Sequence, residues 1–369
     1  MGGLVSKTSP TGVAFGDADV GAKVRFARAN DEGGVNGRKI DYIGSRDDGT
    51  EPGRTADQAR AIVEKDQVFV ASPVTVMNGN YNDAFCNAGL PFFGWGNNTG
   101  FCGNALGFSI NGCQAPKPGQ QRTVDTGGSV GVAPLLPAGA AKTVGVVGVD
   151  NEAAKQGLTT VSQGFQSAGF KVVYNKSPIP VSGLTDATPV INAILKSDGG
   201  RAPSVIFMVA AVGDSTKVAS ALKAAGYKGV IMTPIYDPRL SGVKELDDTY
   251  ALLQWAPGFA TNVPAVATMA KDFQKYAPGA PLSLTAVAGY LSAEFTVDAL
   301  TKTGPNLTVS SFLKTLNGGG YTYYRPGLVA ESRWPLNHVT SVPCATIAHL
   351  KDGKWSAPPL VCGVVTKAG

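Results

Sequence analysis

The sequence lacks both a long apolar run and a basic run. No apolar stretch approaches the ~20 residues that a membrane-spanning helix needs, so the chain is not expected to cross a bilayer. Lysine and arginine are scattered singly, and the net charge is only +5. Because no stripe of positive charge can follow a phosphate backbone, a nucleic acid is not an expected partner.

The sequence also has few residues suited to catalysis or metal binding. Only two histidines are present, His338 and His349, and both fall near the carboxy-terminal strands. The motifs GxSxG, GxxxxGK[ST] and HExxH do not occur, and GVVGVDNEAAKQG lacks the GxGxxG that cradles a pyrophosphate. No CxxC or histidine spacing suggests a metal. We therefore expect neither an enzyme nor a bound cofactor.

The length and composition favour two folded domains. A chain of 369 residues is too long for one ordinary core. Its 43% apolar and 16% charged residues, with 47 Gly and 24 Pro, indicate a folded, turn-rich protein rather than a disordered one. No signal peptide opens the chain, but Met1-Gly2-Gly3 is typical of an expression leader, which leaves room for a targeting segment upstream.

Four of the five cysteines are placed to form two disulfides. Cys344 and Cys362 lie nine residues either side of Gly353, and a hairpin that turns at this glycine would set them opposite each other. Cys102 and Cys113 flank the irregular loop FCGNALGFSINGC, which a local bridge would fix.

The five cysteines allow two interpretations of the redox environment. Cys86 lies in a short helical pattern, YNDAFCNAG, and is predicted to be a buried free thiol. The alternative to two disulfides is five reduced structural cysteines in a cytosolic protein. Because no metal-ligand spacing explains the cysteines, disulfides and an exported protein are favoured.

Apolar patterns predict a first series of alternating strands and helices. Residues 30–40 read NDEGGVNGRKI, where Gly33-Gly34 ends a helix because glycine takes the left-handed conformation freely. Asn36-Gly37 signals a tight turn, and Arg38–Ile43 a short strand. The series comprises strands at 4–6, 40–44, 68–71 and 91–95, and helices at 16–30, 54–65, 80–88 and 125–138.

A second series begins after residue 142. It comprises strands at 143–149, 171–174, 205–209 and 230–232, and helices at 156–168, 190–196 and 218–225. Helices at 264–276, 286–303 and 309–316 follow, and then a hairpin around Gly353. Short apolar strands separated by helices are typical of a parallel sheet covered on both faces. The sequence therefore predicts two α/β lobes.

The amino-terminal motifs resemble a known family. FGDADVGAKVRFARANDEGGVNGRKI (15–40) and DDGTEPGRTADQARAIVEKDQV (47–68) resemble the type I periplasmic solute-binding proteins of ABC importers, in the branched-chain amino acid-binding group. The first helix of that family similarly ends in a Gly-Gly-Ile/Val-Asn-Gly-Arg turn. The resemblance spans essentially the whole chain, including GLPFFGWG (89–96), TVGVVGVDNEAAKQG (143–157) and SVIFMVAAVGD (204–214).

The resemblance implies a fold and a domain organisation. The family has two Rossmann-like lobes joined by three hinge crossings, with the ligand held in the interlobe cleft. The crossings are expected near 126–131, 255–259 and 334–338. Residues 1–128 and 258–336 would form the N-terminal lobe, and residues 129–257 and 337–369 the C-terminal lobe.

The resemblance also implies which residues of the first lobe bind the ligand. Ligands of open α/β sheets bind beyond the carboxyl ends of the strands, which here means loops 12–16, 72–78 and 95–99. Phe15 matches a position whose aromatic ring leans on the ligand, although core packing is the alternative. Thr75 matches a position whose hydroxyl binds the ligand carboxylate.

The loop after the fourth strand supplies further candidates. Gly96 and Asn98 match family positions that offer backbone and side-chain hydrogen bonds. Trp95 and Asn97 are neighbours that an alignment shift of one residue would bring in. A tryptophan between glycines at a strand end is poorly placed for a core, so Trp95 is expected to provide stacking surface.

The second lobe departs from the amino acid-binding pattern. Two aromatic positions of the family fall on Ala154 and Ala211, and the acidic position that holds an α-ammonium falls just before Tyr236 and Asp237. A buried ammonium without a carboxylate is costly, so an amino acid should bind poorly unless Asp237 or Glu152 reaches it. The small residues predict a roomier, more apolar cleft, with Tyr236 as a further stacking surface.

The resemblance therefore implies a binding protein rather than an enzyme. It would capture a small neutral or monoanionic compound, aromatic ones included, by hinge closure, and deliver it to the membrane permease of an ABC importer. The alternatives are a branched-chain amino acid-binding protein and a ligand-sensing receptor domain of the same fold. We expect a monomer that is exported and either periplasmic or anchored at the outer face of the cytoplasmic membrane.

Overall fold

A computed structural model describes residues 1–9 and 14–367, apart from the side chains of residues 152 and 153. The chain forms two compact units and passes between them after Thr123, after Phe259 and after Val342. Each unit is built on a largely parallel sheet with helices between the strands, which confirms the predicted α/β class. Among the described residues, no helix is both long and apolar enough to span a membrane.

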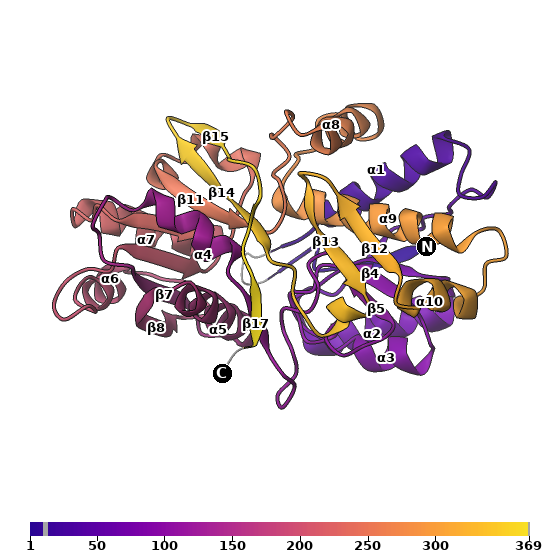
Figure 1. Cartoon of the computed structure of the whole chain (residues 1–369), viewed down its shortest axis with the longest axis horizontal. Coiled ribbons are helices and arrows are strands. Elements are labelled where there is room, and N and C mark those ends of the chain that lie inside the picture. The colour runs from indigo at the N-terminus through magenta and orange to yellow at the C-terminus, as the bar shows by residue number, and fades with distance from the viewer. Residues whose placement is uncertain (10–13, 368–369) are drawn as a thin grey trace. The chain divides into compact units, whose positions relative to one another are not determined.

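The first unit contains a five-stranded parallel sheet in the order β2-β1-β3-β4-β5, of which Figure 1 labels β4 and β5. Its strands are β1 (Gly2–Val5), β2 (Ser45–Asp47), β3 (Ala71–Thr75), β4 (Phe92–Gly94) and β5 (Gly107–Ser109), with the antiparallel hairpin β12 (Tyr321–Arg325) and β13 (Val329–Trp334). Its helices are α1 (Asp17–Asp31), α2 (Pro52–Ala61), α3 (Asn82–Asn87), α8 (Pro264–Tyr276), α9 (Leu284–Thr303) and α10 (Val309–Asn317), with a π-turn at Ile62–Asp66 and a 3₁₀ turn at Leu336–His338.

Helix α9 is the central helix of this unit. Most of its side chains are buried, as expected of a helix that is apolar on nearly every side. It crosses α1 at two glycines, Gly21 and Gly289. A Cβ atom on Gly289 would lie 1.9 Å from the carbonyl oxygen of Ala18, and one on Gly21 would lie 2.0 Å from that of Ala286. The two helix backbones therefore touch directly.

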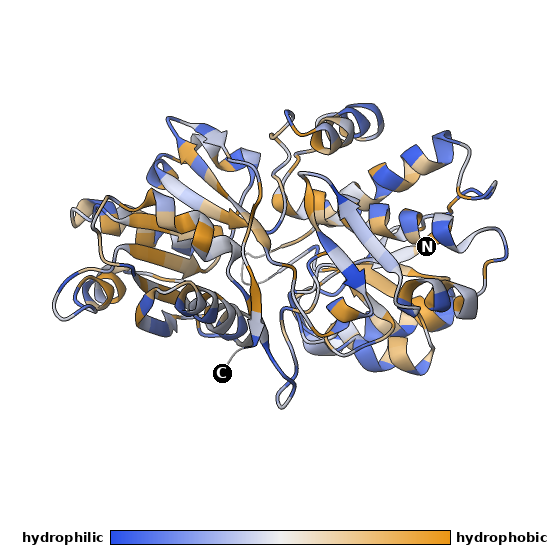
Figure 2. Cartoon of the chain, viewed as in Figure 1, coloured by the Kyte–Doolittle hydropathy of each residue, from blue (hydrophilic) through white to orange (hydrophobic). Residues whose placement is uncertain are grey.

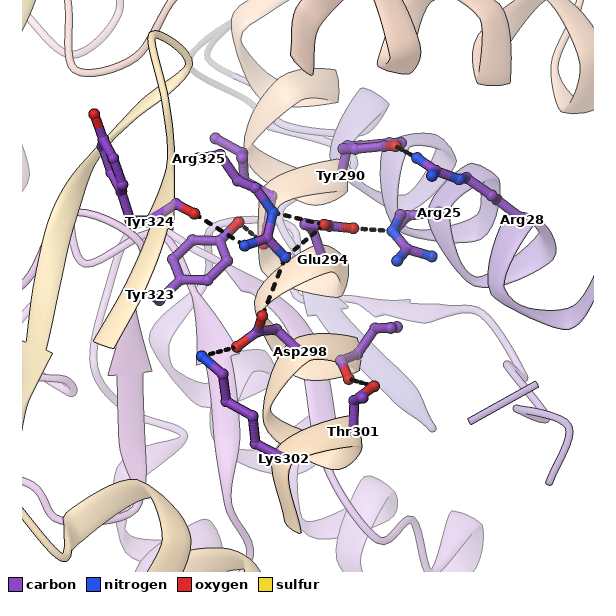
Figure 3. Close-up of polar contacts among 12 residues, drawn as sticks. Arg25, Arg28, Tyr290, Glu294, Asp298, Thr301, Lys302, Tyr323, Tyr324 and Arg325 are labelled. Carbon is purple, nitrogen blue, oxygen red and sulfur yellow. Dashed lines mark hydrogen bonds and ion pairs between the residues drawn. The ribbon is translucent and has the colours of Figure 1, made fainter. Parts of the chain in front are cut away.

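A line of polar side chains interrupts the apolar surface of α9 (Figure 3). Its members are spaced four residues apart: Tyr290, Glu294, Asp298 and Lys302. The Glu294 carboxylate pairs with Arg25 of α1 and, at 2.7 Å, with Arg325 of β12. One buried carboxylate thus joins a helix and a hairpin that are about 300 residues apart in the chain.

The segment NDEGGVNGRKI forms a tight turn rather than a direct entry into a strand. Val35 and Arg38 exchange backbone hydrogen bonds of 2.8 and 3.0 Å, and Asn36 and Gly37 both have positive φ, as a two-residue primed turn requires. The strand predicted at 40–44 is wrong. The second strand of the chain is instead β2, which begins at Ser45. Gly44 also has positive φ, and pairing with β1 begins only at Ser45.

Most elements of this unit differ by one or two residues from their predicted bounds, and β3 and the α2 region differ in a way that has a physical reason. The strand predicted at 68–71 lies later in the chain, as β3 (Ala71–Thr75). Its residues Val74 and Thr75 pair with the end of β1. Ser72 and Pro73 interrupted the apolar pattern, but both are inside the strand. The helix predicted at 54–65 begins at Pro52 as an α-helix and continues as a short π-helix from Ile62.

The second unit contains an eight-stranded sheet with the path β15-β14-β11-β10-β9-β7-β8 and β16 paired to β14. Its strands are β7 (Thr143–Val149), β8 (Lys171–Ile179), β9 (Val205–Val209), β10 (Val230–Thr233), β11 (Thr249–Leu253), β14 (Cys344–Lys351), β15 (Lys354–Ser356) and β16 (Val361–Cys362). Its helices are α4 (Gly127–Val132), α5 (Glu152–Ser167), α6 (Thr188–Leu195) and α7 (Val212–Ala224), with 3₁₀ turns at Ala133–Leu135, Pro238–Gly242 and Lys244–Leu246. A separate pair joins β6 (Thr123–Asp125) to β17 (Val365–Lys367).

The inner strands of this sheet are apolar on both faces. Every residue of β7 is buried, and so is nearly all of its neighbour β9; Figure 2 shows the interior of this sheet largely in the hydrophobic colour. Helices cover both faces of such a strand, so it needs no polar side. This explains why β7 and β9 have the bounds predicted from the sequence.

Both predicted disulfides are present. Cys102 bonds to Cys113 and Cys344 to Cys362, and the latter two are partners in the β14–β16 pair, as the hairpin around Gly353 predicted. The prediction for Cys86 is wrong in one respect. Its thiol is free but exposed, because α3 turns only Phe85 inward.

The unit boundaries shift several residues from those expected. Residues 337–342 belong to the first unit, because His338 contacts the Gly107 carbonyl oxygen and the Asn317 side chain. Residues 124–128 belong to the second unit, where the Thr126 N–H donates to the Val364 carbonyl at 3.1 Å. Residues 258 and 259 also belong there, since the Phe259 ring packs on other residues of that unit.

Asp125, at the end of β6, makes stability depend on pH. Burial raises the pKa of its carboxyl from 3.8 to about 6, while hydrogen bonds from the N–H groups of Gly127 and of Asp125 itself oppose the rise. The folded chain thus keeps a proton that the unfolded chain loses between pH ~4 and ~6, so this contribution to stability is lost as the pH rises through that range. Asp125→Asn is expected to raise the melting temperature relative to wild type at pH 7.5 but not at pH 4. Equal differences at both pH values would contradict this assignment.

Candidate functional site

Three strand ends of the first unit meet at the carboxyl edge of its sheet. Ser6 follows β1, Thr75 ends β3, and Trp95 follows β4. The Ser6 N–H donates to the Thr75 carbonyl at 3.1 Å, the Trp95 N–H to the Val74 carbonyl at 3.1 Å, and the Phe15 N–H to the Ser6 carbonyl at 2.7 Å. These backbone bonds bring the predicted residues Phe15, Thr75 and Trp95 together. Residues 12 and 13 of the predicted loop 12–16 lie outside the described residues.

Phe15 and Trp95 form an aromatic pair at this edge. Their ring centroids are 5.6 Å apart, and the ring planes are inclined at 48°. Phe15 is buried and Trp95 half-buried. Such a pair offers a broad apolar surface with a specific shape, so this arrangement can hold the apolar body of a ligand.

Thr75 and Ser6, which the backbone bonds described above link to each other and to Phe15, each carry a hydroxyl group. Both side chains are fully buried, and neither hydroxyl has a hydrogen-bond partner among the described residues. A buried polar group left unpaired costs about 1–3 kcal/mol, so each calls for an explanation. Thr75 was among the residues predicted from the sequence, and Ser6 was not. The available signal was its position directly after the first strand.

The polar groups of the loop after β4 are largely used within the protein. The Gly96 N–H donates to the Asn111 side chain at 3.0 Å. The Asn98 amide donates to the Val76 carbonyl and accepts from the Tyr81 hydroxyl and the Gly100 N–H. Asn98 therefore holds the loop in place. Its role in ligand binding stays a prediction.

Asn97 also turns back to its own loop. In the amide orientation that satisfies both ends of the side chain, it donates to the Val76 carbonyl at 3.1 Å and to the Trp95 carbonyl at 3.0 Å. Its side chain is half-buried. Asn97 thus supports the backbone that carries the Trp95 ring.

In the second unit, Ala154 and Ala211 lie at the amino ends of helices that follow parallel strands. Ala154 is in the first turn of α5, where its N–H donates to the capping side chain of Asn151 at 2.8 Å. Ala211 precedes the first residue of α7. Both are therefore at the carboxyl edge of the second sheet, and their methyl groups fill much less space than an aromatic side chain would.

Tyr236 packs in the core of the second unit. Only 2% of it is exposed, and its ring packs at 5.2 Å from both Phe259 and Trp355. Burial, with a smaller contribution from the neighbouring Asp237 carboxylate, raises the pKa of its hydroxyl. Tyr236 thus packs against Phe259 and Trp355 within the second unit, and its role as a stacking surface for a ligand stays a prediction.

The carboxylates that follow the strands of the second unit already have cationic partners. Asp237 accepts from the Arg239 guanidinium at 2.8 and 3.0 Å, and Asp150, after β7, pairs with Lys155 at 2.7 Å. The side chain of Glu152, the other acidic candidate, lies outside the described residues. An ammonium ligand would therefore have to compete with Arg239 for Asp237.

The two histidines do not gather into a site. Burial lowers the pKa of His338 to about 4, although its bond to the Gly107 carbonyl opposes the shift, and its ring packs between Phe108 and Trp334. His349 pairs with Asp248 at 2.8 Å. In the part of the chain that the structure describes, no group of His, Cys, Asp or Glu side chains could hold a metal ion.

Comparisons with known proteins give one family and a set of similar folds. Residues 1–354 match the family model described as "Periplasmic binding protein". Comparison of the sequence with curated proteins gave no match. Among solved structures, a branched-chain amino acid transporter substrate-binding protein from Streptococcus pneumoniae, in complex with isoleucine, is similar with a TM-score of 0.72 at 14% identity, covering 100% of this chain and 99% of that one.

Two further similar structures carry other ligands in their names. A fatty acid ABC transporter substrate-binding protein from Thermomonospora curvata has a TM-score of 0.72 at 18% identity and covers 98% of this chain and 91% of that one. A solute-binding protein from R. palustris in complex with benzoate has a TM-score of 0.70 at 16% identity, covering 98% and 96%. At these identities the likeness shows a shared fold and not a shared ligand.

Proposed function

The chain belongs to the periplasmic binding protein family, and from this premise we propose that it captures a small neutral or monoanionic organic compound, rather than a standard amino acid, for an ABC importer. Proteins of this family bind small molecules and work with membrane permeases. The ligand is held by the strand-end loops, and closure of the two units around it forms the state that the permease recognises.

One observation carries the choice against amino acids. Asp237, the carboxylate nearest the family's ammonium-binding position, is already bonded by two contacts to the Arg239 guanidinium. Taking an ammonium out of water without a free carboxylate costs several kcal/mol. Alanine at positions 154 and 211 removes the aromatic faces that could replace the carboxylate.

The first unit supports an apolar ligand body with one polar head. Phe15 and Trp95 offer aromatic surface, and the Thr75 hydroxyl beside them has no protein partner among the described residues. The solved relatives named for benzoate and for fatty acid show that this fold accommodates such acids. The isoleucine complex of the Streptococcus protein keeps a branched-chain amino acid as the second candidate, and a ligand-sensing receptor domain is the other possible setting.

A thermal-shift screen tests the ligand class. The purified protein is first unfolded and dialysed, so that any bound ligand is removed, and is then refolded. One set of compounds holds leucine, isoleucine and valine, and the other holds benzoate, benzamide, hexanoate and octanoate. A ligand at ~100 times its Kd adds roughly 2.7 kcal/mol to the unfolding free energy. We expect shifts with the second set only.

Matched variants show whether a shift arises at the described edge. Trp95→Ala should abolish most of the ligand-induced shift, because it removes half of the aromatic pair. Tyr324→Ala, which truncates an exposed ring on β12, should leave the shift intact. If leucine, isoleucine or valine shifts the melt and the second set does not, the proposal is wrong and Asp237 must release Arg239 to hold the amine.

A further inference from the structure

Ser6 lies between the two residues that define the ligand edge. Its N–H donates to the Thr75 carbonyl and its carbonyl accepts from the Phe15 N–H. The Lys7 N–H donates to the Val5 carbonyl at 2.9 Å, so the chain turns sharply at Ser6 as it leaves β1. Both backbone groups of Ser6 are thus used, and only its hydroxyl is left to interact with something else.

The hydroxyls of Ser6 and Thr75 differ from the other buried hydroxyls of this sheet. Ser72 accepts a hydrogen bond from Thr296 at 2.9 Å, and Ser109 bonds to the side chain of Asn111. Ser6 Oγ and Thr75 Oγ1 have no such partner among residues 1–9 and 14–367. Each of these unpaired buried hydroxyls calls for a partner from outside the described residues, and Ser6 is hydrogen-bonded through its backbone to both Thr75 and Phe15.

The cations at this edge are already neutralised. Lys7 Nζ pairs with Asp19 at 2.7 Å, and Arg54 pairs with Asp47 at 2.9 Å. Among the described residues, the groups left for a polar ligand head at this edge are therefore the neutral hydroxyls of Ser6 and Thr75. Such donors suit an oxygen acceptor, whether a carboxylate or an amide carbonyl.

We propose that Ser6 is a ligand-contacting residue whose Oγ binds an oxygen of the ligand's head group, as Thr75 Oγ1 is proposed to do, while Phe15 and Trp95 hold its apolar body. This inference rests on the proposed function. It adds a residue that the family resemblance did not indicate, and it gives the head group a chemical class.

The inference predicts that stability and binding change in opposite directions. Ser6→Ala removes an unpaired buried hydroxyl, so the ligand-free protein should melt at the same temperature as wild type or higher. The affinity for the compound of the benzoate, benzamide, hexanoate and octanoate set that binds wild type most tightly should fall about tenfold. Thr75→Val should behave in the same way. Isothermal titration calorimetry gives the affinities.

Ser162 provides the matched control. It is also buried and its hydroxyl also has no partner among the described residues, but it lies on α5 in the second unit. Ser162→Ala should therefore leave the affinity unchanged. A benzoate–benzamide comparison separates the two head groups, since loss of affinity for both in Ser6→Ala indicates a shared carbonyl oxygen, and loss for benzoate alone a carboxylate.

The outcomes distinguish the two proposals. If a compound of the set binds wild type and Ser6→Ala binds it equally well, the hydroxyl is satisfied by water and this inference is overturned while the proposed function stands. If no compound of the set binds wild type, both are overturned. If Ser162→Ala loses as much affinity as Ser6→Ala, the loss is not specific to the ligand edge and this inference fails.

Discussion

Replacing Glu294 by glutamine is expected to destabilise the first unit by about 3–5 kcal/mol. The Glu294 carboxylate faces the Arg25 and Arg325 guanidinium groups (Figure 3), and its side chain is only 13% exposed. Burial alone would raise the pKa of Glu294, but the two arginines outweigh it and hold the pKa below its ordinary value. The variant removes the negative charge that both arginines face. Calorimetric or denaturant unfolding would measure the resulting loss in the free energy of unfolding.

Glu331→Gln is the control for this prediction. Glu331 pairs with Arg333 on β13 at 2.6 Å, but both side chains are well exposed, and exposed pairs are worth about 0–1 kcal/mol. The difference in unfolding free energy between the two variants should persist in high salt, because buried charges are screened much less than exposed ones. Equal losses in Glu294→Gln and Glu331→Gln would mean that the three charged groups on α1, α9 and β12 do not act as a buried unit.

The central strands and long helices could be predicted because their sequences admit no other placement. Val205–Val209 is short, β-branched-rich and apolar at every position, and it is buried along almost its whole length, which favours a strand covered on both faces. The strand β3 could not be placed as well. Ser72 breaks its apolar pattern, and the contact that accommodates Ser72 is a hydrogen bond to Thr296, more than 200 residues later.

The same difference separates the predicted site residues. That Phe15, Thr75 and Trp95 lie together could be predicted because the ends of parallel strands meet at one edge of a sheet, which depends on strand order. The role of each residue, Asn98 and Tyr236 included, was inferred from its match to a family position or from its place next to one. Whether an asparagine faces a ligand or a neighbouring tyrosine depends on side-chain packing, and no local pattern in the sequence encodes it.

Replacing Gly289 by alanine is the second large effect expected. In an exposed helix this change is favourable by up to about 1 kcal/mol, but here the new Cβ would lie 1.9 Å from a backbone oxygen of α1. Neither helix backbone can rotate away as a side chain would, so α1 and α9 must separate, and they carry Arg25 and Glu294 with them. We expect a net loss of about 3 kcal/mol or more.

Gly213→Ala is the control that distinguishes the cost of the close helix crossing from the gain in helix propensity. Gly213 lies in α7 and is exposed, and a Cβ atom added to it would have no other atom within 4 Å, so its replacement should be neutral or stabilising. If Gly289→Ala is equally harmless, the two helices must be able to move apart without cost. Because Glu294→Gln and Gly289→Ala weaken the same contact between α1 and α9, their effects should also be less than additive in the double variant. Strict additivity would show that the close helix crossing and the buried charges stabilise the unit independently.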